Sequence, residues 1–236
     1  MPAPDYLTLL FGRYRETPET RPFVTLDIGA KGGRPIALSG SESMRMTHWM
    51  RTMHDGILVG SGTAVGDDPQ LNTRHIPAGE PHEAPTPIVL DSGLRMSVGC
   101  KLVRNYDMGR GVGKQPWVVG VLPSEEKGAW EDRRKALENV GVKVLVLDGV
   151  GLKEMLGVLR KAGIERLMVE GGARVIKSFL DASDVADTLL ITTAPVLVGE
   201  DGVGWSASGS MKLEVVETRM EGRDNVVAFF ARSSAV

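Results

Sequence analysis

The sequence has little that would tie it to a disulfide framework, a membrane or a nucleic acid. Its 236 residues include one cysteine, Cys100, which excludes an internal disulfide and a cysteine-rich zinc site. The longest apolar runs are about as long as a strand, far short of the ~20 residues that a membrane-spanning helix needs. The 28 basic and 30 acidic side chains nearly balance and form no block of like charge, so the sequence gives no electrostatic basis for nucleic-acid or membrane binding.

What is present is the composition of an ordinary globular protein, with 42% hydrophobic and 25% charged residues. The length fits a single domain over residues 1–236. The N-terminal segment has neither the cationic stretch nor the apolar core of a signal peptide. We therefore expect a cytoplasmic protein in which a few local groups hold any anionic ligand.

Short apolar runs rich in β-branched residues alternate with amphipathic stretches. Several runs are apolar on both faces, as strands inside a sheet covered on both sides are. The amphipathic stretches have serine or glycine at their ends, which is typical of helix termini. The sequence predicts strands at 23–26, 56–59, 87–90, 117–121, 142–147, 166–169 and 188–191, and helices at 43–53, 124–139, 152–161 and 173–180.

This alternation predicts an α/β fold with a mostly parallel central sheet flanked by helices. The tail differs, because residues 211–217 alternate, 222–225 form a turn signal and 226–230 return. That pattern predicts a C-terminal antiparallel hairpin. Proline-rich 75–87 and glycine-rich 108–115 are expected to be surface loops.

A glycine-rich segment directly follows the strand expected at 56–59. A turn or short helix beginning after Gly60 would aim backbone N–H groups at an anion, and Ser61 and Thr63 add hydroxyl donors. The spacing is not the G-x-G-x-x-G fingerprint, because Val65 stands at the third glycine position, and it is not a P-loop. A ligand site and a simple tight turn both remain open here.

A second strand exit reads Val169-Glu170-Gly171-Gly172-Ala173-Arg174. The glycines permit close approach of a ligand, and the helix start offers unpaired N–H groups and a dipole that favours a pyrophosphate. Glu170 stands at the carboxyl end of a strand, where open α/β sheets bind ligands. A glycine entry turn is the plain structural alternative, but two such exits in one chain favour a ligand site.

Two arginines flank the first glycine-rich segment, Arg51 before it and Arg74 after it. A guanidinium group suits phosphate because its planar fork donates two hydrogen bonds at once. The alternative for each is a solvated surface side chain. The chain contains no G-x-S-x-G motif, so the sequence gives no support for a serine hydrolase.

Metal ligation finds little support. Asp67 and Asp68 could form a pair of ligands, but no matching histidine or aspartate cluster accompanies them, and capping or hydroxyl binding is favoured. His48 and His54 are six residues apart and do not share a helix face as zinc ligands would. We expect no metal site, and both histidines to be structural or solvent-facing.

Several blocks of the chain, taken in order, resemble the pyrimidine reductases of riboflavin biosynthesis, especially the stand-alone fungal form. They span nearly the whole sequence, and Gly-x-Gly-Thr followed by Asp-Asp-Pro-x-Leu is the most specific part. The blocks are residues 21–26, 46–51 continuing through 54–63 to 67–72, 87–92 and 169–173, and 194–199 also fits.

The resemblance implies a dihydrofolate-reductase-like fold, a homodimer, and NADPH-dependent reduction of 2,5-diamino-6-ribosylamino-4(3H)-pyrimidinone 5′-phosphate to the ribitylamino product. Glu170 is then the candidate catalytic residue, facing the substrate. The resemblance and the two glycine-rich exits together give the expected cofactor-binding residues. These are Gly60, Ser61, Thr63, Asp67, Val146, Gly171, Gly172, Ala173 and Arg174. The substrate-binding residues are Arg51, Leu71, Arg74 and Glu170.

One segment departs from the family pattern. Members usually carry Ser-x-Asp-Gly after the first strand, whereas this chain has Ala30-Lys31-Gly32-Gly33-Arg34. The missing aspartate lies near the substrate pocket in the family. Two alternatives therefore stay open, a reductase of the same fold acting on another imine or enone and a non-catalytic nucleotide-binding protein. The donor of the proton that the product amine needs also stays open between Glu170, Asp67 and water.

Overall fold

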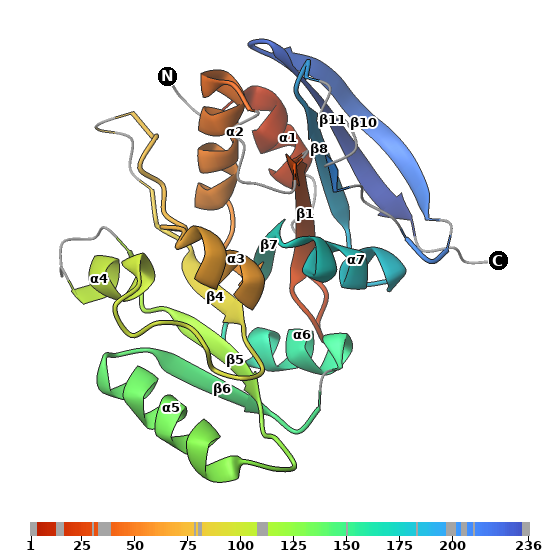
Figure 1. The fold of residues 1–236 in the computed structure, drawn as a ribbon. Coiled ribbons are helices and arrows are strands. Elements are labelled where there is room, and N and C mark those ends of the chain that lie inside the picture. The colour runs from red at the N-terminus through yellow and green to blue at the C-terminus, as the bar shows by residue number, and fades with distance from the viewer. Residues whose placement is uncertain are drawn as a thin grey trace.

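The computed structural model describes residues 4–12, 17–29, 31–32, 39–77, 79, 82–107, 113–149, 151–182, 184–196, 202–203, 207–209 and 211–232. Strands and helices alternate through most of them (Figure 1). The strands are β1 (Phe23–Gly29), β2 (Lys31–Gly32), β3 (Gly56–Gly60), β4 (Thr86–Leu90), β5 (Trp117–Val121), β6 (Lys143–Leu147), β7 (Arg166–Gly171), β8 (Thr188–Thr193), β9 (Gly202–Val203), β10 (Lys212–Glu221) and β11 (Asp224–Arg232). The helices are α1 (Asp5–Gly12), α2 (Ser41–Thr52), α3 (Ser61–Asp67), α4 (Lys101–Asp107), α5 (Lys127–Asn139), α6 (Leu152–Lys161) and α7 (Ala173–Asp181).

Nine of these strands form one sheet in the order β10-β11-β8-β1-β7-β3-β4-β5-β6. Neighbours from β8 to β6 are parallel, and β11 and β10 complete one edge as an antiparallel hairpin. The expected fold class, α/β with a mostly parallel sheet and a C-terminal antiparallel hairpin, is confirmed. Parallel strands direct their carboxyl ends to the same edge, so the exits of β1, β3 and β7 are brought together there.

Helices cover both faces of the sheet. On one face α6 and α7 pack Leu156 and Phe179 into the core over β1 and β7. On the other face α1 and α2 pack over Phe23 and Met168, while α3, α4 and α5 cover the β3–β5 side around Trp130. The strands covered on both faces are the continuous apolar runs of the sequence, as burial on two sides requires.

The strands extend beyond their sequence-predicted ends where polar or glycine residues continue the pairing. β1 runs on through Asp27 to Gly29, because these residues pair with Leu190 and Thr192 of β8. The helix expected at 43–53 has no serine cap, since it starts at Ser41 after Gly40 and the Ser43 hydroxyl instead donates to Asp224 and the Gly40 carbonyl. The helix expected from 124 begins three residues later, at Lys127.

Two helices were not predicted, α1 and α4. The start of α4 is held by Asp68, whose Oδ1 accepts a hydrogen bond from the Lys101 N–H at 2.8 Å. Such a cap comes from 33 residues away in the chain and leaves no local signal. Asp68 therefore serves as a cap, which was the favoured interpretation of that residue.

Of the two expected loops, residues 75–77, 79 and 82–85 have no regular structure, and 108–112 lie outside the described residues. Of the segment at 30–34, which departs from the family's sequence pattern, the structure describes only residues 31–32. They form β2 and pair with β9. No described helix is both long and apolar enough to cross a bilayer.

Candidate functional site

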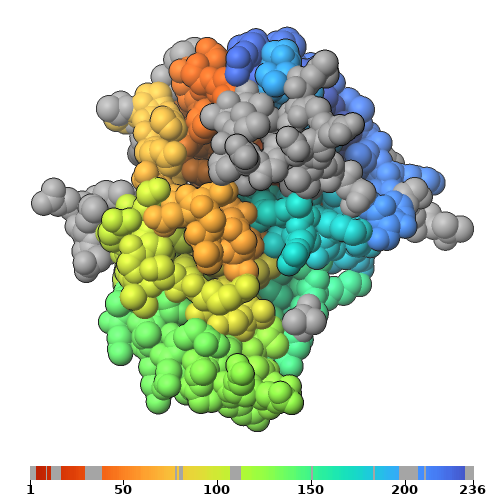
Figure 2. All heavy atoms as spheres, viewed as in Figure 1, coloured from red at the N-terminus to blue at the C-terminus, as the bar shows by residue number. Residues whose placement is uncertain are grey.

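The two glycine-lined strand exits lie side by side. β3 and β7 are parallel neighbours, and Val59 pairs with Gly171. α3 and α7 follow these exits and lie next to each other at the molecular surface (Figures 1 and 2). A Cβ added to Gly172 would meet Thr63 Oγ1 at 3.2 Å, and one added to Gly60 would meet Val175 Cγ2 at 2.7 Å. Glycine is required at both positions because a side chain would fill the space between the exits.

A cleft of about 730 Å³ opens between the two exits. Every expected cofactor residue except Gly171 and Val146 lines it. Gly171 immediately precedes the lining residue Gly172, and both have positive φ angles, +139° and +47°. The lining residues are Gly60, Ser61, Gly62, Thr63, Val65, Gly66, Asp67, Leu90, Arg95, Gly172, Ala173, Arg174 and Val175.

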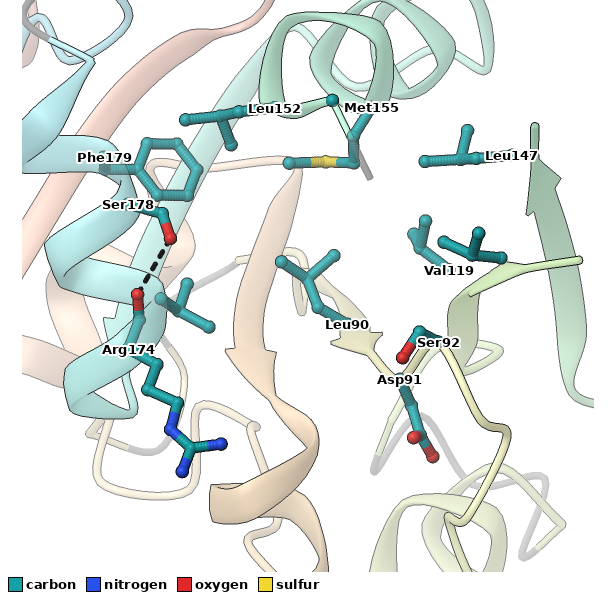
Figure 3. Close-up of a pocket in the computed structure, with 13 residues that line it drawn as sticks. Leu90, Asp91, Ser92, Val119, Leu147, Leu152, Met155, Arg174, Ser178 and Phe179 are labelled. Carbon is teal, nitrogen blue, oxygen red and sulfur yellow. Dashed lines mark hydrogen bonds between the residues drawn. The ribbon is translucent and has the colours of Figure 1, made fainter. Parts of the chain in front are cut away.

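An apolar cavity of about 240 Å³ adjoins this cleft and shares Leu90, Arg174 and Val175 with it. Figure 3 shows apolar side chains from α6, α7 and the ends of β4–β6 around it, with the Arg174 guanidinium directed away from them. Leu147 at the end of β6 lines the cavity, whereas the preceding Val146 is 38% exposed and does not line it. The structure therefore brings Val146 near the cavity but not into its wall.

Arg95 also lines the cleft and was missed by the sequence reasoning. The buried Asp91 carboxylate accepts hydrogen bonds from the Arg95 and Met96 N–H groups and from Arg95 Nε, the last at 3.1 Å. Arg95 Nη2 in turn donates to Ser61 Oγ at 2.7 Å. The signal in the sequence was an aspartate at a strand end followed four residues later by an arginine.

On the other side of β7, Arg51 and Glu170 form a bidentate ion pair. Arg51 Nε and Nη2 donate to the two Glu170 oxygens at 2.7 and 2.6 Å, and Nη1 donates to the Asn72 carbonyl at 2.7 Å. The two side chains are 11% and 12% exposed. Burial opposes the charge of Arg51, but Glu170 outweighs it and raises the arginine's pKa. Arg51 thus holds the Glu170 side chain in one orientation next to the cleft.

The structure gathers all four expected substrate residues into one cluster. Asn72 links them, since its carbonyl binds Arg51 and its Oδ1 accepts from Arg74 Nη1 at 3.1 Å. Leu71 is buried beside it with φ +45°. Arg74 is exposed, whereas Arg51 is committed to Glu170. Of the two arginines, Arg74 is the one with a guanidinium accessible to an anion.

Asp27 is a further member of this cluster that the sequence reasoning missed. It lies on β1 and is partly exposed, and its carboxylate accepts a hydrogen bond from the Thr47 hydroxyl of α2. Burial and, next in size, the charge of Glu170 raise the pKa of Asp27 to about 7, while Arg51 and the Thr47 hydrogen bond oppose the shift. The available signal was a carboxylate continuing an apolar strand that was expected to end at residue 26.

His48 and His54 are both buried, so the solvent-facing alternative is ruled out for each and the structural one holds. Nδ1 of His54 lies 2.7 Å from the Met50 carbonyl and Nε2 lies 2.8 Å from Thr25 Oγ1. Burial lowers the pKa of His54 to about 4 and, aided by nearby Arg51, that of His48 to about 3. Both rings are therefore neutral near pH 7.

The sheet order and the paired glycine exits define a dihydrofolate-reductase-like α/β protein. More narrowly, the chain belongs to the RibD C-terminal domain family, whose model matches residues 23–227. It is 34% identical over 210 residues to 2,5-diamino-6-ribosylamino-4(3H)-pyrimidinone 5′-phosphate reductase of Candida glabrata, in an alignment that covers 82% of this chain and 83% of that one. The protein of the same name from Debaryomyces hansenii is 36% identical over 205 residues, with 80% and 81% covered. The solved structure of the riboflavin biosynthesis reductase Rib7 of Saccharomyces cerevisiae matches with a TM-score of 0.74 and 26% identity, covering 96% of this chain and 98% of that one.

Proposed function

We propose that this protein reduces 2,5-diamino-6-ribosylamino-4(3H)-pyrimidinone 5′-phosphate to its ribitylamino product in riboflavin biosynthesis, using NADPH. The observation that carries the proposal is the position of the Arg51–Glu170 pair directly beside the glycine-lined cleft between β3 and β7. Relatives that share about a third of this chain's residues over four-fifths of its length bear the name of that reductase.

The residues of the cleft fit a dinucleotide. Gly171 and Gly172 leave room for a pyrophosphate at the start of α7, where the first N–H groups of a helix lack partners within it. Arg174 and Arg95 add positive charge at the same cleft, suited to a phosphate on the adenosine ribose. The adjoining apolar cavity is suited to a flat adenine ring. When bound, NADPH supplies the hydride that the sugar C1 receives.

The residues grouped around Glu170 have different roles toward the substrate. Arg74, with its exposed guanidinium, holds the 5′-phosphate, while Arg51 keeps Glu170 in one orientation facing the sugar. Leu71 supplies apolar packing next to them. By fixing the reacting carbon against the cleft, this arrangement supplies orientation, which is a large part of what a reductase contributes.

The test is to supply the purified protein with NADPH and the ribosylaminopyrimidine phosphate, following NADPH absorbance and identifying the ribityl product by mass spectrometry. Arg74→Gln should raise KM for this substrate and leave KM for the dephosphorylated substrate unchanged. NADPH binding with no oxidation on this substrate refutes the proposal. Oxidation with a different imine or enone would then favour the other reductase activity, and binding without any turnover a non-catalytic role.

We further propose, from the same resemblance, that a single reductase domain over residues 1–236 acts as a cytoplasmic homodimer, without nucleic-acid or membrane partners. Light scattering on the purified protein at micromolar concentration tests the dimer. A mass equal to the 25.4 kDa chain would refute it.

A further inference from the structure

Asp27 is a second carboxyl group beside Glu170, on the neighbouring strand. It follows Leu26 in β1, and Leu26 pairs with Val169, the residue before Glu170. Helix α2 supplies a hydrogen-bond donor to each carboxyl group, Arg51 to Glu170 and the Thr47 hydroxyl to Asp27. The charged groups that face Asp27 are therefore Glu170 from β7 and Arg51 from α2.

The two carboxyl groups differ in their partners. Both oxygens of Glu170 accept charge-assisted hydrogen bonds from Arg51, at 2.7 and 2.6 Å, which hold the group in one orientation. Asp27 receives a hydroxyl hydrogen bond from Thr47 and lies next to a fixed negative charge. With its pKa raised to about 7, Asp27 is protonated in a large share of molecules at neutral pH. Neighbouring carboxyl groups with unequal environments commonly take separate acid and anion roles.

We propose that Asp27 is a catalytic residue that delivers the proton to the imine nitrogen of the open-chain substrate, while Glu170 remains an anion held by Arg51. This inference rests on the proposed function. In this step the hydride from NADPH forms a C–H bond at the sugar C1, and the π bond between C1 and nitrogen breaks. The electron pair of that bond takes the Asp27 proton to form N–H, and Asp27 is left as a carboxylate that water reprotonates.

The other titratable groups near the cluster suit this role less well. His48 and His54 are buried and neutral, with pKa values lowered to about 3 and 4 chiefly by that burial. Asp67 lies at the end of α3 on the cofactor cleft, among the residues assigned to the dinucleotide. Asp27 combines partial exposure with a raised pKa close to the expected position of the sugar.

The decisive variant is Asp27→Asn, which keeps the side-chain shape but has no ionisable proton. We expect the rate of NADPH oxidation at saturating substrate to fall about 10²–10⁴-fold, the usual range for a lost general acid. NADPH affinity and KM should stay within a few-fold of wild type. Asp27→Glu should recover part of the rate because it restores a carboxyl group. Asp132→Asn, on the exposed side of α5, is the matched control and should behave as wild type.

Two further measurements, a pH profile and an NMR titration, test the role of Asp27 if the Asp27→Asn variant folds poorly. The wild-type rate should decline as pH rises through about 7, and this decline should be absent from any residual activity of the Asp27→Asn variant. A carbon-13 NMR titration of the free protein should show the Asp27 carboxyl ionising near pH 7. A titration midpoint near ~4, the ordinary aspartate value, overturns the inference, as does an Asp27→Asn rate within threefold of wild type with the same pH profile. An inactive wild type would instead refute the proposed function, so the two failures are distinguishable.

Discussion

Replacing Arg51 by methionine tests the ion pair on which the substrate side of the site depends. Methionine favours helix and has a similar length, so α2 itself should be little affected. The change leaves the Glu170 carboxylate, 12% exposed, without its bidentate partner. Breaking a buried ion pair by removing one partner costs about 3–5 kcal/mol. The Asn72 carbonyl also loses its hydrogen bond, which adds up to ~1 kcal/mol.

For a chain of this length, 1 kcal/mol corresponds to roughly 2–4 °C in Tm, so the variant should melt about 6–24 °C below wild type. Urea unfolding at pH 7.5 provides the free energy, with fluorescence of the buried Trp49 and Trp130 as the signal. The loss should shrink at pH 5, because Asp27, whose pKa is about 7 beside Arg51, is protonated there with or without the arginine and its attraction to Arg51 no longer counts.

A double-mutant cycle separates the pair from its surroundings. Glu170→Gln removes the charge that Arg51 neutralises, so Arg51→Met combined with Glu170→Gln should cost less than the sum of the single changes. A coupling free energy of about 2–3 kcal/mol is expected for a pair with this geometry and burial. Strict additivity, or a loss below ~1 kcal/mol for Arg51→Met alone, would refute the view that the pair is a buried structural unit.

Three further predictions follow from the cofactor cleft and the buried titratable groups. Asp67→Ala should weaken NADPH binding far more than it lowers stability, and unchanged affinity in a fluorescence titration would contradict its assignment. Gly172→Val places a branched side chain at φ +47°, 3.2 Å from the opposite exit, and should reduce NADPH affinity at least ~10-fold, the equivalent of about 1.4 kcal/mol. Gly128→Ala in α5, where an added Cβ meets nothing within 4 Å, is the control. His54 stays neutral when folded because its pKa is lowered to about 4, whereas the unfolded chain binds a proton below ~6.5. Its contribution to stability should therefore be lost as pH falls from about 6.5 to about 4, and urea titrations of His54→Gln should show a shallower decline.

The sequence was sufficient for the strands and the fold class because their signal is local. Short apolar runs rich in β-branched residues identified all seven parallel strands of the sheet. Strand ends were placed too early where pairing continues through polar residues, and Asp27 was overlooked for that reason. The start of α4 could not be seen because its cap, Asp68, is 33 residues away.

The candidate site could be predicted as a set of residues but not as a set of contacts. Arg51 and Glu170 were both expected near the substrate, yet they are 119 residues apart and nothing in the chain indicates that they bind each other. That contact commits Arg51 to Glu170, which is why the proposed phosphate contact is assigned to Arg74. That the two glycine exits meet the same edge of the sheet was predictable, because the strands of a parallel sheet end at one edge, whereas their adjacency depends on the strand order.

The end of β7 contributes residues to both of the proposed ligand sites. Opposite β3, Leu58 pairs with Val169 and Val59 pairs with Gly171, so Glu170 is the extra residue of a β-bulge. A bulge re-aims a side chain while the strand continues, and here the Glu170 carboxylate meets Arg51 of α2. The next two residues, Gly171 and Gly172, contribute backbone to the cleft beside α7 without side chains. Three consecutive residues thus bring the Glu170 carboxylate of the proposed substrate site and the glycine backbone of the proposed phosphate cradle within about 7 Å along the chain.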